Sequence, residues 1–446
     1  SPNNKYKSLK LAIPILRNVM QVLGSVLALA TIILTFLLWR MSDGPVSLTF
    51  LRPHLEQLLN VQGSATQITF EQLQASWPEW APYLVFTGHN LSAGTIDGEA
   101  NAVAEVFSAR LSVPALLRGN ISFTKIDITG LNLQMVRPTM NPGPETNTQF
   151  LFNHYLQPAF EHLSQVISEI TPKFALLQVE ELSVSNTHLA MLNSSNSLEW
   201  EITSTNWHVT QYNQSIVISI ASILNIGREE LNFSAKADYS RANRIWNTKF
   251  SFSDFRPDQF HLIDKTLRNS VDLKANISGN FATSFETISD VKKVEFELFC
   301  LEGQASFPEK SMFFGGYQIK DMRMNGHFTT QNPSIFLENF EGIFNGSEVY
   351  GSASLTNLNT TPHINAAFDA HQIPVDQLSR IWPQNLATST RNWVLKNISG
   401  GTLKDITAYM DFSVDDLGAE TLKRNQIFGE FRVEDTEVEY IDGLPP

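Results

Sequence analysis

The sequence contains very little cysteine and little charge, and it lacks basic runs beyond its first forty residues. The single cysteine, Cys300, excludes an internal disulfide framework and a cysteine-rich metal centre. Charged residues make up only 17% of the 446 residues and the formal net charge is −13, so the basic surface that nucleic acid requires is missing. We therefore expect no nucleic-acid partner. Cys300 lies in strand-like surroundings, which predicts a buried small hydrophobe rather than a reactive thiol.

Motifs that carry catalysis are also missing. The sequence contains no HExxH, no GxSxG elbow, no Walker-type phosphate loop and no GxGxxG. Its ten histidines are scattered, and the pairs His154/His162 and His363/His371 are each eight residues apart, which does not place two ligands on adjacent helical turns. The sequence predicts a protein that is not an enzyme and has no cofactor or metal. A catalytic dyad assembled from distant residues is the alternative.

One long apolar run stands out near the start of the chain. Val19 to Trp39 is 21 residues long without a charge, which is enough for a helix to cross a hydrocarbon core. Lys5, Lys7, Lys10 and Arg17 precede the run, so the positive-inside rule places residues 1–18 in the cytoplasm and the main body outside it. We expect a single-pass anchor over residues 19–39. A cleaved signal peptide or a buried helix is the alternative.

Two further helices are expected. Residues 40–62 carry Phe50, Leu51, Leu55, Leu58 and Leu59 at helical spacing, which predicts a juxtamembrane helix. Residues 149–171 carry large apolar side chains with the helical period and predict a helical insertion in the region 63–446.

Alternation of apolar and polar residues predicts β-strands over most of residues 63–446. The stretches 231–240, 271–281 and 405–415 each place apolar side chains on one face and polar ones on the other. No alternation of strands and helices indicates a parallel sheet, so we expect a mainly β, antiparallel fold. The side chains expected on the apolar face are Phe233, Tyr239, Val271, Leu273, Ile277, Phe281, Ile406, Met410 and Phe412, with Asp405, Asp411 and Asp415 facing water.

Alternation alone does not decide what packs against the apolar faces of these strands. Two sheets packed face to face would bury them, and periodicity alone favours such a sandwich because closed cores are common. The other solution is one long curved antiparallel sheet whose apolar face lines an elongated groove.

Three segments resemble the bacterial AsmA-like superfamily, which includes TamB- and YhdP-type proteins. LRGNISFTKIDITGLNLQMVR (117–137) is similar to its repeated strand motif, and GPVSLTFLRPHLEQLL is similar to the juxtamembrane region of the YhdP-like branch. The most specific match is RIWPQNLATSTRNWVLKNISGGTLKD, within a helical segment expected at about 375–399. Its matching positions are Trp382, Pro383, Arg391, Trp393, Asn397, Ile398 and Gly401.

The resemblance implies an inner-membrane anchored periplasmic protein of the bridge-like lipid-transfer type, of which this chain looks like an N-terminal fragment. An apolar β-groove would carry phospholipid between inner and outer membranes and so support outer-membrane lipid homeostasis. The resemblance favours the curved sheet over the sandwich, and it allows for an outer-membrane or periplasmic partner protein. The alternatives are a TamB-like factor for outer-membrane protein assembly and a passive envelope tether. For the segment from Arg380 to Gly401 we expect short helices at the edge or mouth of the groove, anchored by Trp382 and Trp393, with Gly400 and Gly401 ending the second helix.

Overall fold

The structure of the chain is a computed structural model. It describes residues 25, 28–29, 31–32, 35–53, 56, 66–95, 100–120, 122–136, 179–192, 198–212, 215–226, 229–258, 272–287, 290–307, 314–358, 360–382, 384, 386–413, 416 and 426–439. The helix expected at 149–171 lies outside these residues, as does much of the run 19–39. Within the described part of the chain, no helix is long and apolar enough to span a membrane.

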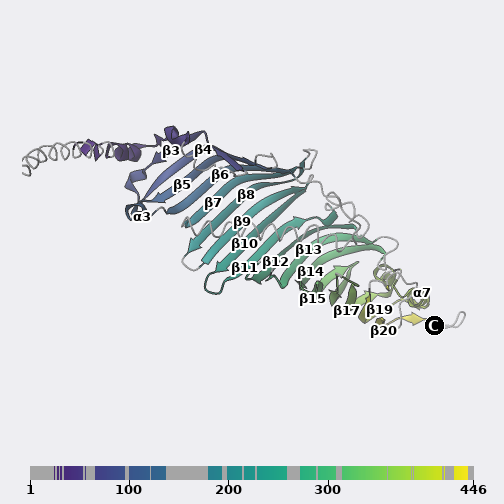
Figure 1. The fold of residues 1–446 in the computed structure, drawn as a ribbon. Helices are drawn as coiled ribbons and strands as arrows, with labels where there is room; N and C mark the ends of the chain where they lie inside the picture. The colour runs from purple at the N-terminus through teal and green to yellow at the C-terminus, as the bar shows by residue number, and fades with distance from the viewer. Residues whose placement is uncertain are drawn as a thin grey trace, which may run out of the picture. The chain divides into compact units, whose positions relative to one another are not determined.

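The fold is mainly β and the described strands pair in antiparallel fashion, which confirms the expected class (Figure 1). Among the described residues, nineteen strands belong to one long sheet and two form a separate pair. The chain divides into two compact units: the first comprises residues 1–130 and 177–180, the second residues 131–176 and 181–446.

In the first unit, helical residues 35–43 are followed by the first strands of the long sheet. Its short helix α3 starts with Ser112 as its N-cap, whose hydroxyl accepts a hydrogen bond from the backbone N–H of Ala115 at 3.3 Å. Of the helix expected at 40–62, residues 40–43, 52–53 and 56 are helical, and a strand and a 3₁₀ turn lie between them. The elements are β1 (Val46–Ser47), η1 (Thr49–Leu51), β2 (Thr66–Thr69), β3 (Gln72–Ser76), η2 (Pro78–Trp80), β4 (Tyr83–Thr95), β5 (Ala100–Ser112), α3 (Val113–Leu117) and β6 (Phe123–Val136), which continues into the second unit.

The second unit is a meander in which consecutive long strands pair with each other. The strands are β7 (Glu181–Leu192), β8 (Leu198–Tyr212), β9 (Ser215–Ile226), β10 (Glu229–Ser240), β11 (Ile245–Phe255), β12 (Asp272–Phe285), β13 (Lys293–Phe307), β14 (Gly315–Thr329), β15 (Ser334–Phe344), β16 (Ser347–Thr356), β17 (His363–Pro374), β19 (Thr402–Ser413) and β20 (Ile427–Glu434). Between β17 and β19 lie η7 (Val375–Gln377), α6 (Leu378–Ile381), α7 (Thr388–Asn397) and β18 (Ile398–Ser399), which pairs with β21 (Glu437–Val438).

Strand register places the apolar residues of neighbouring strands on the same face. Phe233 of β10 lies opposite Phe252 of β11, and Phe252 lies opposite Gly279 of β12. Gly279 in turn lies opposite Leu298 of β13. The same correspondence continues to the last strands, where Ala366 of β17 faces Met410 of β19. Side chains alternate between the two faces of a strand, so one continuous apolar face runs across the second unit.

Bulges interrupt the strict two-residue period in many strands. At two of these bulges, two polar residues stand between two apolar ones, and the second polar residue is an aspartate. This residue is Asp254 between Phe252 and Phe255, and Asp321 between Ile319 and Met322. Both aspartates have positive φ, as do Asn186, Ser204 and Gln372 in the corresponding steps of β7, β8 and β17. Each bulge adds one residue and bends its strand, yet it returns the chain to the same face.

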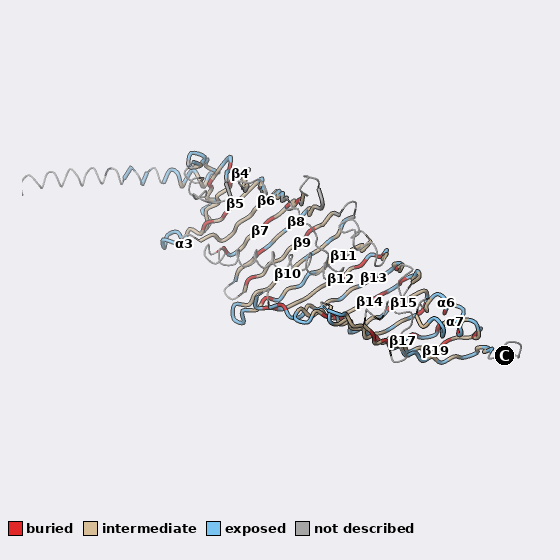
Figure 2. Tube along the Cα trace, turned by 45° about the vertical axis from the view of Figure 1, so that its right-hand side comes forward, coloured by how far each residue is buried: buried red, intermediate tan, exposed pale blue. Residues whose placement is uncertain are grey.

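The sandwich that periodicity alone favours is wrong for the described strands. Among these residues, the only strands outside the long sheet are the paired two-residue strands β18 and β21. Small side chains such as Ala275 and Cys300 are buried by their neighbours, whereas larger ones around them, such as Phe252 and Leu298, are only half-buried. Most of β9 to β12 is accordingly drawn as half-buried in Figure 2. Burial of Cys300, 1% exposed, is confirmed.

Candidate functional site

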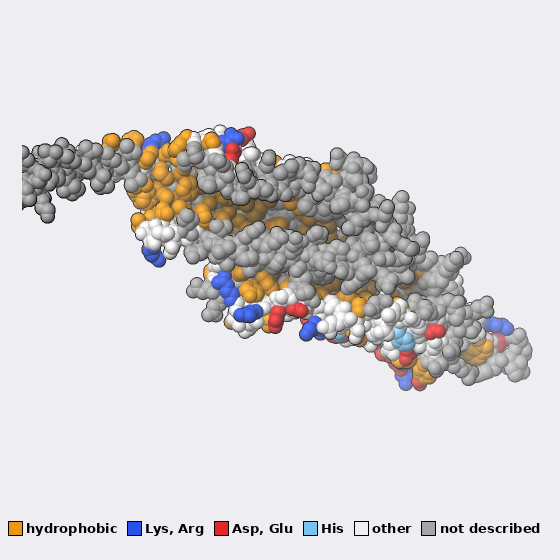
Figure 3. Space-filling view, viewed as in Figure 1, with side chains coloured by type: hydrophobic (Ala, Val, Ile, Leu, Met, Phe, Trp, Pro, Cys, Tyr) orange, Lys and Arg blue, Asp and Glu red, His pale blue; other side chains and the backbone are white. Residues whose placement is uncertain are grey.

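The apolar face of the second unit is the candidate site, and its centre is a group of phenylalanines on β10 to β12. The ring centroid of Phe250 lies 5.8 Å from that of Phe233, 6.2 Å from that of Phe252 and 6.4 Å from that of Phe281. Phe250 is 37% exposed and the other three are half-buried. Hydrophobic side chains gather on the face of the molecule turned to the viewer in Figure 3. Such partly exposed aromatic rings can contact an apolar ligand without a second protein layer.

The residues that the sequence predicts for the centre of the apolar face lie on that face where the structure describes them. Leu273 and Phe281 are half-buried, and Ile277, 8% exposed, belongs to the cluster around Cys300. Tyr239 packs on Trp246 with 4.8 Å between ring centroids. Val271 lies outside the described residues.

A small polar area interrupts the apolar face on β7 to β9. Thr187, Thr205 and Ser222 are all buried, and the hydroxyl of Ser222 donates to that of Thr205 at 2.9 Å. On the same face Val209 lies opposite Ile218, and the polar Gln211 lies opposite Ile216. The face is therefore apolar over most of its length but not uniformly so.

At the C-terminal end of the unit a helical segment covers the apolar face. Leu378 of α6 and Val394 of α7 are buried against Ile373 and Leu403, and Leu386 packs against the cluster of Met410 and Phe412. Ile406 is half-buried beside the first cluster. Met410 and Phe412 lie on the expected face, but they are 5% and 1% exposed, so this end has a closed core and not an open surface.

Hydrogen bonds within the segment explain the residues of its sequence motif. Arg391 donates from Nε to the carbonyl of Trp382 at 3.2 Å, and the indole N–H of Trp382 donates to the carbonyl of Leu386 at 2.8 Å. Asn397 donates from Nδ2 to the carbonyl of Trp393 at 2.7 Å. Trp382 is packed in the cluster of Leu378, whereas Trp393 is 47% exposed. The bond of Arg391 joins α7 to the end of α6, the bond of Trp382 lies in the connection between them, and the bond of Asn397 lies within α7.

The glycine pair lies beyond the helix that it was expected to end. Helix α7 ends at Asn397, the short strand β18 follows, and Gly400 and Gly401 then turn the chain into β19. Both glycines have positive φ, and a Cβ on Gly401 would lie 2.3 Å from the carbonyl oxygen of Glu434. This turn therefore requires glycine. Pro383 lies outside the described residues.

The opposite face of the sheet carries most of the charged residues. His188 Nε2 lies 2.9 Å from Glu201 Oε2, His327 Nδ1 lies 2.8 Å from Glu338 Oε1, and His371 Nδ1 lies 3.3 Å from Asp405 Oδ1. These histidines are accounted for by pairs with carboxylates on an exposed face. No group of residues that could hold a metal ion occurs in the part of the chain that the structure describes.

Sequence reasoning missed several residues of the candidate site. Phe250 and Phe252 of β11 and Trp207 of β8 lie on the apolar face by register. The alternation in IWNTKFSFSDF, 245–255, was the signal that identifies the first two. No protein-family model matches the chain, and no curated protein matches it.

Proposed function

We propose that this chain is a periplasmic protein, anchored in the bacterial inner membrane by residues 19–39, whose apolar face carries phospholipid between the inner and outer membranes. The observation that carries the proposal is the group of partly exposed phenylalanines on an apolar face that continues from strand to strand. An acyl chain on this face would be shielded from water on one side, and each methylene removed from water is worth about 0.8 kcal/mol. No covalent chemistry is needed for this role.

A photo-cross-linking amino acid in place of Phe281 tests the proposal directly. The matched control is Phe299, which is 39% exposed and faces Arg323 and Ser278 on the polar face. We expect phospholipid to be captured at position 281 and not at position 299. Equal capture at both positions, or none at either, would contradict lipid carriage.

The orientation of the chain has its own test. A reporter enzyme that is active only outside the cytoplasm, fused after Gly44, should be active because the basic residues precede the apolar run. Activity of a cytoplasmic reporter at the same place would overturn the periplasmic location and lipid carriage between the two membranes with it.

A second candidate, handling of outer-membrane β-strands, draws on the edge of β20 that has no partner strand among the described residues. Among the described strands β20 pairs only with β19, and Phe428 on β20 is 58% exposed. An open edge can bind a further strand by hydrogen bonding. Protein rather than lipid in the cross-link at position 281 would favour this role.

A further inference from the structure

The end of the first unit carries large exposed apolar side chains that the apolar face of the second unit does not include. Leu117 in α3 is 83% exposed and its neighbour Leu116 is 43% exposed. Trp80 in η2 is 55% exposed, and it is held outward by a loop in which both Glu79 and Trp80 have positive φ, a conformation that such residues rarely adopt. Exposed apolar side chains grouped in this way mark an interaction surface.

These side chains come from segments that are hydrogen-bonded at the same end of the unit. The backbone N–H of Val113, at the start of α3, donates to the carbonyl of Pro82 at 3.0 Å. Tyr83 lies opposite Ser112, so η2 and α3 meet at one end of strands β4 and β5. The ring of Trp77 packs on that of Trp80 with 4.8 Å between centroids, which fixes the indole in place.

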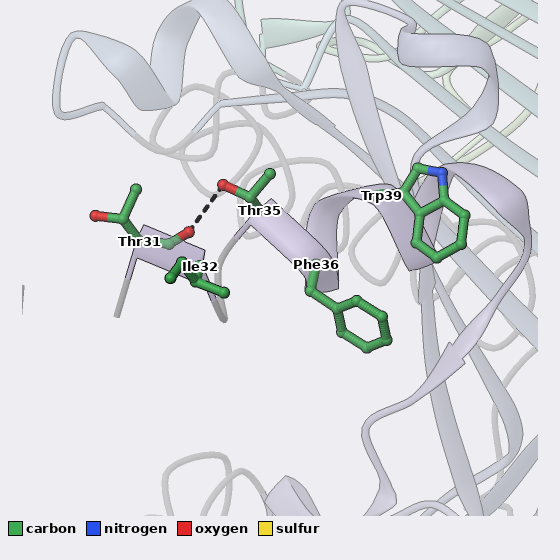
Figure 4. A pocket seen from close by; sticks show the side chains of 5 residues that line it. All are labelled: Thr31, Ile32, Thr35, Phe36 and Trp39. Atoms are coloured by element: carbon green, nitrogen blue, oxygen red, sulfur yellow. Dashed lines mark hydrogen bonds between the residues drawn. The ribbon is translucent and has the colours of Figure 1, made fainter. Parts of the chain in front are cut away.

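The helix of residues 35–43 is joined to the same end. The backbone N–H of Trp77 donates to the carbonyl of Met41 at 2.8 Å. Phe36 and Trp39 are 58% and 56% exposed, and their ring centroids are 5.9 Å apart; Figure 4 shows how both extend from the helix. Residues 35–39 of this helix are the C-terminal part of the uncharged run 19–39, so whatever surrounds that run lies close to Trp80 and α3.

The geometry points to a second membrane contact: we infer that Trp80, Leu116 and Leu117 insert into the interfacial layer of the bilayer that holds residues 19–39. Tryptophan and leucine suit this layer, since one end of the indole can stay hydrated while the rest is in contact with lipid. Arg118 follows Leu117 directly and is exposed, and Arg40 follows Trp39, so cationic groups lie where anionic headgroups would be. Leu84 faces Leu111 at this end of β4 and β5, so a docked bilayer would bring acyl chains next to apolar side chains of the first unit.

This inference rests on the proposed anchor, and labelled single-cysteine variants separate the two. In a Cys300→Ala background, a fluorophore that brightens in apolar surroundings is attached at Leu117→Cys, at Phe36→Cys in the anchor, or at Leu301→Cys. Leu301 is the matched control because it is 77% exposed, on β13. The full chain is reconstituted in vesicles of phosphatidylethanolamine and phosphatidylglycerol, with or without nitroxide on the acyl chains.

We expect nitroxide lipid to remove about half or more of the emission at positions 117 and 36 and to leave position 301 unchanged. Quenching at 36 without quenching at 117 overturns the docking surface and leaves the anchor standing. Absence of quenching at both positions overturns both proposals. A further outcome would also overturn the inference. If nitroxide lipid does not quench position 117, but in detergent this position becomes more protected from aqueous iodide as the protein concentration rises, the surface binds a second copy of the chain.

Discussion

Replacing Phe250 with aspartate should remove lipid from the apolar face while leaving the second unit folded. The ring of Phe250 is central in its group, and it is 37% exposed, so an introduced carboxylate can reach water. Full burial of a phenylalanine is worth about 1.5–3 kcal/mol, and the buried part of this ring therefore about 1–2 kcal/mol. Loss of its aromatic contacts adds about 1 kcal/mol. We expect the free energy of unfolding to fall by about 2–3 kcal/mol.

The same substitution should also strongly reduce the amount of bound phospholipid. A charged group that keeps about two methylenes off the face costs about 1.6 kcal/mol of binding, which is roughly a 15-fold loss of bound phospholipid. Phe299→Asp is the matched control, since Phe299 is 39% exposed but lies on the polar face. It should lower the free energy of unfolding by about 1–2 kcal/mol and change lipid binding less than about two-fold.

The assay is the amount of phospholipid that co-purifies with each variant, measured by mass spectrometry beside its thermal unfolding. Two results would refute the reasoning. Equal lipid loss in both variants would show that the apolar face is not where lipid binds. Collapse of Phe250→Asp alone, with no soluble protein, would show that this part of the face is a closed core like the one at Met410.

Three further predictions concern other positions. Met410→Asp should lower the free energy of unfolding by about 3–5 kcal/mol, because it places an unpaired charge at a site that is 5% exposed; denaturant titration measures it. Gly326→Ala should cost about 1–3 kcal/mol in thermal unfolding, since its Cβ would lie 1.9 Å from the carbonyl oxygen of Phe336, whereas Gly429→Ala, with no atom near, should cost little. Burial raises the pKa of the Cys300 thiol above its usual 9.0, so the folded chain keeps a proton that the unfolded chain loses. The contribution of Cys300 to stability should therefore be fully present below pH 9 and decline above it, a decline that Cys300→Ala should remove from urea titrations across this range.

The sequence predicts the strands better than it predicts how they are covered. Alternation in 271–281 and 405–415 places Ile277 and Met410 on the correct face, because the two-residue period follows directly from strand geometry. A sandwich and an open sheet produce the same alternation. Periodicity therefore could not decide between them, and the preference it gave was wrong.

Coverage depends on contacts between residues that are distant in sequence. Leu386, from the segment between β17 and β19, packs against the cluster that contains Met410 and so contributes to its burial. The bulges also hide the apolar face in the sequence, because the step from Ala370 to Ile373 spans three residues and looks like a break in the strand. Several of these bulges share a sequence pattern that could have identified them. Two polar residues stand between two apolar ones, and the second polar residue is asparagine, aspartate, serine or glutamine.

The meander of the second unit has a consequence for how it unfolds and how it can change in length. Each long strand from β8 to β17 is hydrogen-bonded to its two neighbours, so stability is close to a sum of nearest-neighbour terms along one dimension. Damage at one end, such as a charge beneath Leu386, should melt the adjacent strands and leave β8 to β10 ordered. By the same reasoning, a hairpin whose bulges keep the register could be added or removed without redesign of the others, so the length of the apolar surface is a property that evolution can adjust two strands at a time.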